Sequence, residues 1–478
     1  MSAGVTSPPA SPGGGAGGGG GGGSEYGGLT LESVKRRLLR GSAWVTGGRM
    51  LSIALGLALN ALLAHILTHA ELGQYFTTMA LVFVGSIIAQ LGLDRAVVRF
   101  VSTALALDEP GQAKEVVKRV FFFCSIGAVV TALILALGLG GWLARNVYHD
   151  AVLATLMPIA AGWLIITALQ QLLVDTWRGF QRFDLASLFD QVLIDILSVT
   201  IFGAIYLLHA SVTVHQVVLL SAGFSLTTTV IAAGLLLGKL RRLGDEGEPL
   251  PKGELYAMAW PLLITNVAIY LLGTSIDLWI LGAFRPQDQV ALYGVASRVM
   301  FLVATPYLIL QGVTPPLIAE MYAKGKKREM ERTLRMVSTV AGLPAVLALI
   351  GFLLFGDKLL GVFYGHFYEQ AAGVLAILSA GRLVAVWTGS AGVTLMMTGH
   401  QKALMYITVF SGMASVTADL LLAPHFGKVG VAIGTATTQA MQNILQVLLA
   451  KRLVGVWTMA HLSPKPLIDF LKPQRSPV

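Results

Sequence analysis

Three arginines stand inside long apolar stretches of the 478-residue chain: Arg49, Arg298 and Arg382. A guanidinium stays charged at any physiological pH, and its planar fork donates paired hydrogen bonds to the oxygens of a phosphate or carboxylate. Ionisable groups in apolar segments are costly and usually face a water-filled cavity or a charged partner. These arginines are therefore candidates for binding an anionic group of a cargo. The other interpretation is that each pairs with an acidic side chain on a neighbouring segment.

The three positions differ in depth. Arg382 lies about 16 Å along its apolar stretch and Arg298 about 12 Å along its own, at the usual rise of a helix. For Arg298 a role in function and a structural role both stay open. Arg49 is only about two helical turns from one end of its stretch, so its side chain can also extend to lipid headgroups.

Acidic residues occur in the same kind of segment: Asp190, Asp195 and Asp277. A buried carboxylate can take up and release a proton and so couple movement of a cargo to an ion gradient. The same carboxylates can instead neutralise the embedded arginines, and both interpretations stay open. Asn60 and Asn266 are more typical of hydrogen bonds between helices than of ligands.

The elements that must position these groups are membrane spans. Of the residues, 55% are hydrophobic and only 12% are charged, at a mean hydropathy of +0.72, whereas an ordinary soluble chain has about 25% charged residues. A crossing helix needs about 20 mostly apolar residues. We predict twelve spans: 43–68, 74–93, 120–141, 152–174, 185–208, 214–238, 257–283, 290–316, 335–355, 371–398, 403–423 and 428–450.

The distribution of positive charge gives these spans an orientation. If the N-terminus is cytoplasmic, 27 of the 34 lysines and arginines fall on the cytoplasmic side, 4 fall in the opposite loops, and the 3 embedded arginines remain. This asymmetry follows the positive-inside rule. It predicts that both termini are cytoplasmic and accounts for the net charge of +9 without a nucleic-acid partner.

Weak internal similarity divides the spans into two sets of six. Tyr75 opens the second predicted span and Tyr293 the eighth, while Trp44 and Trp260 open the first and the seventh. Six spans is an even number, so both halves enter the membrane in the same orientation, as in transporters built from parallel repeats. We expect the following segments: a disordered glycine-rich tail (1–28), a basic amphipathic segment (29–42), an N-terminal six-helix bundle (43–238), a linker (239–256), a C-terminal six-helix bundle (257–452) and a cytoplasmic tail (453–478).

Several chemistries find no support in the sequence. It contains no phosphate-binding Gly-Lys-Ser/Thr loop and no histidine or cysteine cluster with metal-ligand spacing. The predicted outer loops are short, which disfavours a membrane enzyme that polymerises or ligates glycan. We therefore expect neither an enzyme nor a cofactor. A scaffold without transport would leave the embedded charges unexplained.

Two stretches resemble a known family. The first runs from Arg40-Gly41-Ser42-Ala43-Trp44 through Glu71-Leu72-Gly73-Gln74-Tyr75 to Leu91-Gly92-Leu93-Asp94-Arg95. The second comprises Thr398-Gly399-His400-Gln401-Lys402 and the segment 423–435. They resemble polysaccharide transporters, the O-antigen and oligosaccharide-lipid flippases of the multidrug/oligosaccharidyl-lipid/polysaccharide (MOP) exporter superfamily. His65 departs from the pattern, since relatives often have arginine there, and so does the glycine-rich tail.

The resemblance implies an all-α polytopic membrane protein with the MATE-like fold of this superfamily, two six-helix bundles around a cavity. It implies a flippase that moves a polyprenyl-pyrophosphate-linked oligosaccharide from the cytoplasmic to the outer leaflet of the inner membrane by alternating access. The implied partners are the lipid-linked glycan, membrane lipids and polysaccharide polymerase machinery, and the implied products are O-antigen, capsule or exopolysaccharide. The alternative within the superfamily is a multidrug or small-molecule exporter, whose interior would present acids and aromatic rings to cationic drugs.

Overall fold

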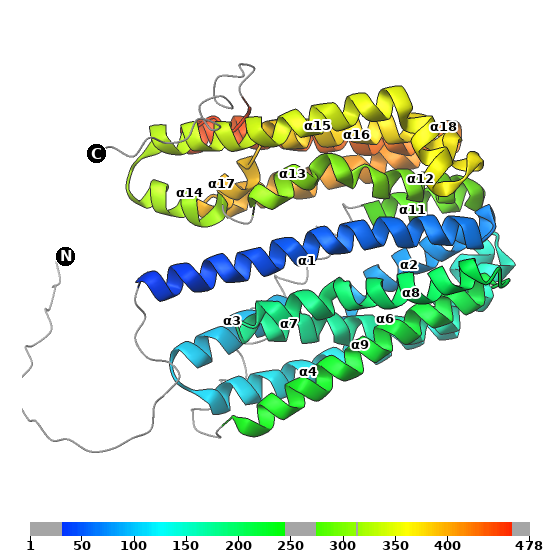
Figure 1. The fold of residues 1–478 in the computed structure, drawn as a ribbon, viewed down its shortest axis with the longest axis horizontal. Coiled ribbons are helices and arrows are strands. Elements are labelled where there is room, and N and C mark those ends of the chain that lie inside the picture. Colours follow the sequence, from blue (N-terminus) through cyan, green and yellow to red (C-terminus); the bar gives the residue numbers. More distant parts are fainter. Residues whose placement is uncertain (1–30, 244–273, 312–313, 461–478) are drawn as a thin grey trace, which may run out of the picture. The chain divides into compact units, whose positions relative to one another are not determined.

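The computed structural model describes residues 31–243, 274–311 and 314–460, and these residues form helices joined by short turns (Figure 1). The N-terminal part contains α1 (Leu31–Ile66), α2 (His69–Ala89), α3 (Leu93–Ala106), α4 (Pro110–Ile134), α5 (Gly140–Trp142), α6 (Ala151–Gly179), α7 (Phe183–Ser187), α8 (Leu193–Leu207) and α9 (Val214–Arg242). The C-terminal part contains α11 (Thr274–Phe284), α12 (Gln287–Val299), α13 (Phe301–Gln311), α14 (Thr314–Ala323), α15 (Lys327–Tyr364), α16 (Ala372–Thr388), α17 (Ala391–Met397) and α18 (Gln401–Leu453).

Within the described part, 9 helices are long and apolar enough to cross a membrane, and Met50–Ile66 and Ala96–Leu105 are shorter apolar helices. Helical segments occupy the described portion of every predicted span. Much of the seventh span, together with Trp260 and Asn266, lies outside the described residues. The prediction of an all-helical multi-pass membrane protein is confirmed, whereas the two-bundle division and the domain bounds remain predictions.

Some predicted spans are not single regular helices. The eighth divides into α12 and α13 at Met300, and the tenth divides into α16 and α17 at Gly389 and Ser390. The eleventh and twelfth join as α18, which turns at Gly427, where φ is 58° and ψ is −138°. Helix α1 runs without interruption through the predicted border at residue 42, and a membrane-surface location of 29–42 stays a prediction.

Local chemistry explains where several helices start. Thr68 and Glu71 form a reciprocal capping box at the start of α2, which satisfies amide groups that have no partner within the helix. Asp150 caps α6 by accepting hydrogen bonds from the amides of Val152 and Leu153. Its other oxygen accepts a hydrogen bond of 2.8 Å from the Gln74 side chain, so this cap also ties α6 to α2.

The helical segment after α7 contains a π-helical turn, Leu188–Val192. A π turn shifts the backbone hydrogen bonds and often occurs at functional sites. The buried Gln170 side chain of α6 donates a hydrogen bond of 3.0 Å to the Phe189 carbonyl. Gln170 thus satisfies a carbonyl of this turn.

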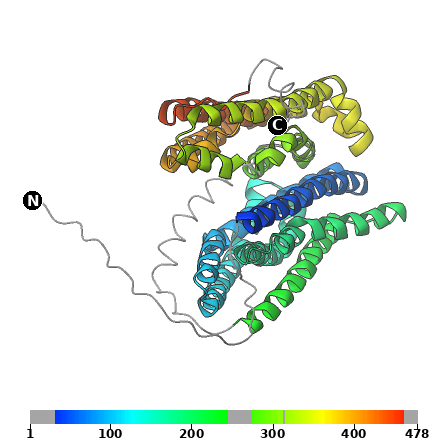
Figure 2. The same ribbon diagram turned by 60° about the vertical axis from the view of Figure 1, so that its left-hand side comes forward.

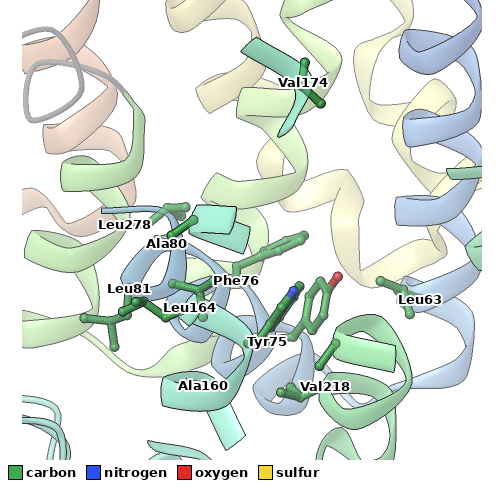
Figure 3. Packing of buried hydrophobic residues seen from close by; sticks show 14 of the residues in the cluster. Leu63, Tyr75, Phe76, Ala80, Leu81, Ala160, Leu164, Val174, Val218 and Leu278 are labelled. Atoms are coloured by element: carbon green, nitrogen blue, oxygen red, sulfur yellow. The ribbon is translucent and has the colours of Figure 1, made fainter. Parts of the chain in front are cut away.

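Helix α6 is the packing centre of the N-terminal part, in contact with α2, α3, α4 and α9. Figure 3 shows Tyr75 and Phe76 of α2 beside Ala160 and Leu164 of α6, within one buried apolar cluster. In the C-terminal part α16 packs against α15 and α18, and these helices lie together at one side in Figure 2. Van der Waals contacts between these closely packed side chains stabilise each group, since lipid tails are as apolar as the side chains themselves.

The two parts of the chain meet through α2, which contacts both α11 and α12. The backbones approach closely because Gly73 of α2 faces the Gln287 carbonyl and Gly294 of α12 faces the Phe76 ring. The Thr77 hydroxyl donates a hydrogen bond of 3.0 Å to the Gln287 side chain within this buried contact. We call this surface the α2–α12 contact. By the charge distribution, its end near Gly73 lies on the predicted outer side of the membrane.

Candidate functional site

Arg298 lies in the last turn of α12 and extends across the α2–α12 contact. Its guanidinium lies 4.6 Å from the centroid of the Phe76 ring, and Nη2 is 3.5 Å from the sulfur of Met79. The Tyr75 and Tyr364 hydroxyl groups and the Asp195 carboxylate lie within electrostatic range. A cation over an aromatic face is stabilised by the ring quadrupole, so this arginine is held without a direct ion pair.

Arg382 lies on α16 and is held in a similar way. Its guanidinium is 4.9 Å from the centroid of the Phe301 ring, which begins α13 three positions after Arg298. The Nε atom is buried and has no hydrogen-bond partner. Arg382 therefore has unused donor capacity beside the junction of α12 and α13.

Neither of these guanidinium groups pairs with a carboxylate in the described residues. The hypothesis that the embedded acids neutralise Arg298 or Arg382 by direct contact is therefore not supported there. Arg49 lies on α1, but its side chain is outside the described part of the structure, and both interpretations of Arg49 stay predictions.

Asp190 and Asp195 have different surroundings although both follow α7. Asp190 is exposed and accepts a hydrogen bond of 2.8 Å from Arg178, which also donates to Asp175. Pairing is thus observed for Asp190, with an arginine that the sequence analysis did not single out. Asp195 is buried and accepts a hydrogen bond of 3.1 Å from Gln191, while its second oxygen has no partner.

Asp277 belongs to a buried group of polar side chains formed by α11, α12 and α18. The hydroxyl groups of Tyr293 and Thr435 both donate to Asp277 Oδ2, at 2.6 and 3.0 Å. The carboxyl group of Asp419 lies within electrostatic range of Asp277. Asp419 is 0% exposed and Asp277 is 2% exposed. We call these four residues the carboxyl pair site.

Asp419 receives no hydrogen bond at either oxygen. A Cβ atom at Gly434 would lie 2.5 Å from its Oδ1, so glycine leaves the space that this carboxyl group occupies. Two buried carboxylates side by side repel each other strongly unless a proton or another cation lies between them. No described cation reaches this site, and the described residues contain no group of three or more metal-ligating side chains.

Sequence reasoning missed Asp419, although it stands in the predicted eleventh span, within Thr417-Ala418-Asp419-Leu420-Leu421. An acid in the middle of an apolar run is the same signal that selected Asp277. Asp419 is significant because it lies beside Asp277. The kinked α18 places Asp419 and Thr435 around the Asp277 carboxylate of α11, and the spacing along the sequence does not reveal this arrangement.

The arrangement offers two kinds of chemistry. Arg298 and Arg382 present positive charge over aromatic rings, and among the residues that the structure describes no carboxylate pairs with either of them. The carboxyl pair site brings two buried acidic groups together, and a proton or a cation between them would relieve their repulsion. Arg298 contacts Phe76 and Met79 of α2 in the N-terminal part, whereas the carboxyl pair site is formed by α11, α12 and α18.

Comparisons with known proteins agree with this description. Residues 38–322 match the family described as "Polysaccharide biosynthesis protein", and residues 261–421 match the family described as "MatE". The "Probable low-salt glycan biosynthesis flippase Agl15" of Haloferax volcanii is 27% identical over 172 residues, which are 35% of this chain and 36% of that protein. The chain thus matches about a third of the length of this relative.

Solved structures show the same fold. An inward-facing multidrug resistance MATE family transporter of the MOP superfamily superposes with a TM-score of 0.68 at 15% identity, covering 84% of this chain and 94% of that one. The "Lipid II flippase MurJ, inward closed conformation" superposes with a TM-score of 0.67 at 14% identity, covering 85% and 87%. The predicted resemblance to this superfamily is confirmed, and the fold is that of a MOP transporter.

Proposed function

Because this chain belongs to the polysaccharide biosynthesis protein family and has the MOP transporter fold, we propose that it is a flippase for a lipid-linked oligosaccharide. The cargo is a glycan on a polyprenyl pyrophosphate, which moves from the cytoplasmic to the outer leaflet for assembly of a cell-surface polysaccharide. The location is the inner membrane, with both termini cytoplasmic as the charge distribution predicts. The protein moves its cargo and catalyses no covalent step.

The proposal rests on the surroundings of the two embedded arginines, Arg298 and Arg382. Each guanidinium rests on a phenylalanine ring, Arg298 on Phe76 and Arg382 on Phe301, and neither contacts a described carboxylate. Charged side chains in a membrane protein are retained where they serve function. A pyrophosphate offers oxygens that suit both guanidinium forks.

The carboxyl pair site provides the ion coupling. Asp277 and Asp419 are too close and too deeply buried for both to be charged without a compensating cation. Uptake of a proton or monovalent cation removes one of the two negative charges and relieves the repulsion between α11 and α18, and release restores that repulsion. Repulsion of this kind favours a different helix arrangement, so an ion gradient can drive the cycle.

Alternating access requires that the α2–α12 contact opens when the cargo leaves toward the outer side. In the present arrangement the two glycines bring α2 and α12 together there. Arg298 spans the same contact, so binding of an anionic cargo near Arg298 would change the stability of the closed form.

A multidrug exporter is the second candidate. The match of residues 261–421 to the MatE family favours it, as does the buried acidic pair. The embedded arginines favour the flippase, because a cationic drug would be repelled by them.

The test is reconstitution of the purified protein into liposomes with a polyprenyl-pyrophosphate oligosaccharide, followed by a membrane-impermeant lectin that reports the outer leaflet. We expect Arg382→Ala and Arg298→Ala to reduce flipping by ~10- to 100-fold, the range for losing hydrogen bonds to a charged group. Arg241→Ala is the matched control, since Arg241 is exposed at the end of α9. Equal flipping by all variants would refute the role of these arginines, and export of cationic dyes without lipid flipping would favour the second candidate.

A further inference from the structure

The break between α16 and α17 depends on a segment from the far end of the described chain. Residues 454–460 follow the last helix in an irregular conformation. Val454, Val456, Thr458 and Ala460 are at most 4% exposed, and they alternate with more exposed neighbours. We call residues 454–460 the C-terminal clasp.

Each of the last four carbonyl groups of α16 has an identified partner, as a helix end requires when little water is available. Two partners are local: the Thr388 hydroxyl donates to the Ala385 carbonyl at 2.9 Å, and the Gly389 amide donates to the Val386 carbonyl at 3.2 Å. These local donors satisfy two of the four carbonyl groups.

The other two partners come from the clasp. The Ala460 amide donates to the Trp387 carbonyl at 2.8 Å, and the Thr458 hydroxyl donates to the Thr388 carbonyl at 2.8 Å. Without the clasp these carbonyls would need new donors, and the simplest source is the continuation of α16 into α17 as one helix.

Two further contacts hold the clasp in place. The Ser338 hydroxyl of α15 lies 2.8 Å from the Thr458 carbonyl and donates to it, and the Trp457 amide donates to the Glu331 side chain at 3.2 Å. Gly389 has a φ of 72°, which favours glycine, and a Cβ atom there would lie 2.6 Å from the Thr458 carbonyl. The break at Gly389 and the C-terminal clasp are therefore in close contact, and a larger side chain at position 389 would prevent this contact.

Arg382 lies on α16, six positions before Thr388. If α16 continued through Gly389 as one regular helix, α16 would have to rotate or shift relative to α17. The Arg382 guanidinium would then move away from the Phe301 ring. We propose that the C-terminal clasp is a positioning element: by holding the tenth span broken, Thr458 and the Ala460 amide set the location of Arg382. This inference rests on the proposed function only where it concerns cargo.

The first experiment reads the location of position 382 without any cargo. Cys124 is the single cysteine of the chain and is buried, so a Cys124→Ala background with Arg382→Cys provides one reporter thiol. We would measure its rate of reaction with a small anionic methanethiosulfonate. Adding Thr458→Val is expected to change this rate by about fivefold, as for loss of one typical hydrogen bond.

Thr458→Ser keeps the hydroxyl group and should restore the original rate. Thr417→Val is the matched control, because the exposed Thr417 hydroxyl bonds only to the Met413 carbonyl of its own helix. If Thr458→Val does not reach the membrane, Ala460→Pro removes the other donor, since proline has no amide hydrogen. An unchanged rate in the folded Thr458→Val or Ala460→Pro variant overturns the proposal.

The second experiment retains Arg382 and measures flipping against cargo concentration. Thr458→Val is expected to raise the half-saturating concentration about fivefold with a smaller change in maximal rate, and Thr458→Ser is expected to match the wild type. If the wild type moves no lipid-linked glycan while the thiol rate still responds to Thr458, the clasp stands and the proposed function fails. If flipping proceeds normally in Thr458→Val and the thiol rate is unchanged, the clasp has no positioning role.

Discussion

Closure of the α2–α12 contact depends on the absence of a side chain at Gly73. A Cβ atom there would lie 2.7 Å from the Gln287 carbonyl carbon and closer still to its oxygen, whereas nonbonded carbon atoms prefer about 3.5–4.0 Å. The obstacle is backbone, so no rotamer change can relieve it. We predict that Gly73→Ala forces α2 and α12 apart by about 1 Å and so destabilises the closed form.

The magnitude follows from the packing at the contact. Overpacking a well-packed contact costs about 3 kcal/mol at the upper end of the usual range. The higher helix propensity of alanine does not enter, because α2 is helical in the closed and the open forms alike. A cost of about 3 kcal/mol corresponds to ~150-fold in the equilibrium between the closed and open forms of the contact.

Distances between spin labels provide the assay. Labels at Ala70→Cys and Asp288→Cys, both exposed near the starts of α2 and α12, report the separation in a Cys124→Ala background. Gly73→Ala should add a population at longer distance and slow flipping. Gly162→Ala is the matched control, because Gly162 is also helical and a Cβ atom there meets nothing within 4 Å. Identical distance distributions for the two variants would refute the reasoning.

Three further predictions use other parts of the molecule. Asp419→Asn should keep cargo binding but abolish the dependence of flipping on an ion gradient, measured in liposomes with and without the gradient; full gradient dependence would exclude Asp419 from coupling. Gln170→Leu removes the donor to the Phe189 carbonyl and should destabilise the protein by about 1–3 kcal/mol, seen as a lower Tm in detergent. Phe76→Leu removes the ring under Arg298 and should weaken pyrophosphate binding by ~3- to 30-fold, because the cation–π contact contributes about 0.5–2 kcal/mol. Titration calorimetry measures the binding, and Phe76→Tyr, which keeps an aromatic ring, is the control.

Much of the fold was predictable from sequence because membrane helices are selected by simple, local properties. An apolar run of sufficient length must form a helix in lipid, since its backbone groups have no other partner there. Asp277, Arg298 and Arg382 stand out in such runs for the same reason: a charge in an apolar segment needs an explanation. Residue type and depth along a span therefore sufficed to select these positions.

The partners of these residues were not predictable, because pairing depends on which helix faces meet. Asp277 lies beside Asp419, which comes 142 positions later, and the kink of α18 at Gly427 brings Thr435 to the same oxygen. Asp190 has the spacing of an embedded acid but pairs with Arg178 at an exposed location. No linear pattern encodes these distances.

The sequence by itself determined the class of protein, the helical character of its apolar segments and the positions of the embedded charges, because hydropathy and charge act along the chain. The orientation in the membrane remains a prediction. Only the tertiary structure decided that the arginines rest on aromatic rings, that two acids share one buried site, and that the tenth span is broken. The break at Gly389 illustrates the reason. A helix end in an apolar environment is stable only if its carbonyl groups have hydrogen-bond donors. Half of the donors at the end of α16 belong to residues about 70 positions later in the chain, and only the folded structure brings them to this helix end.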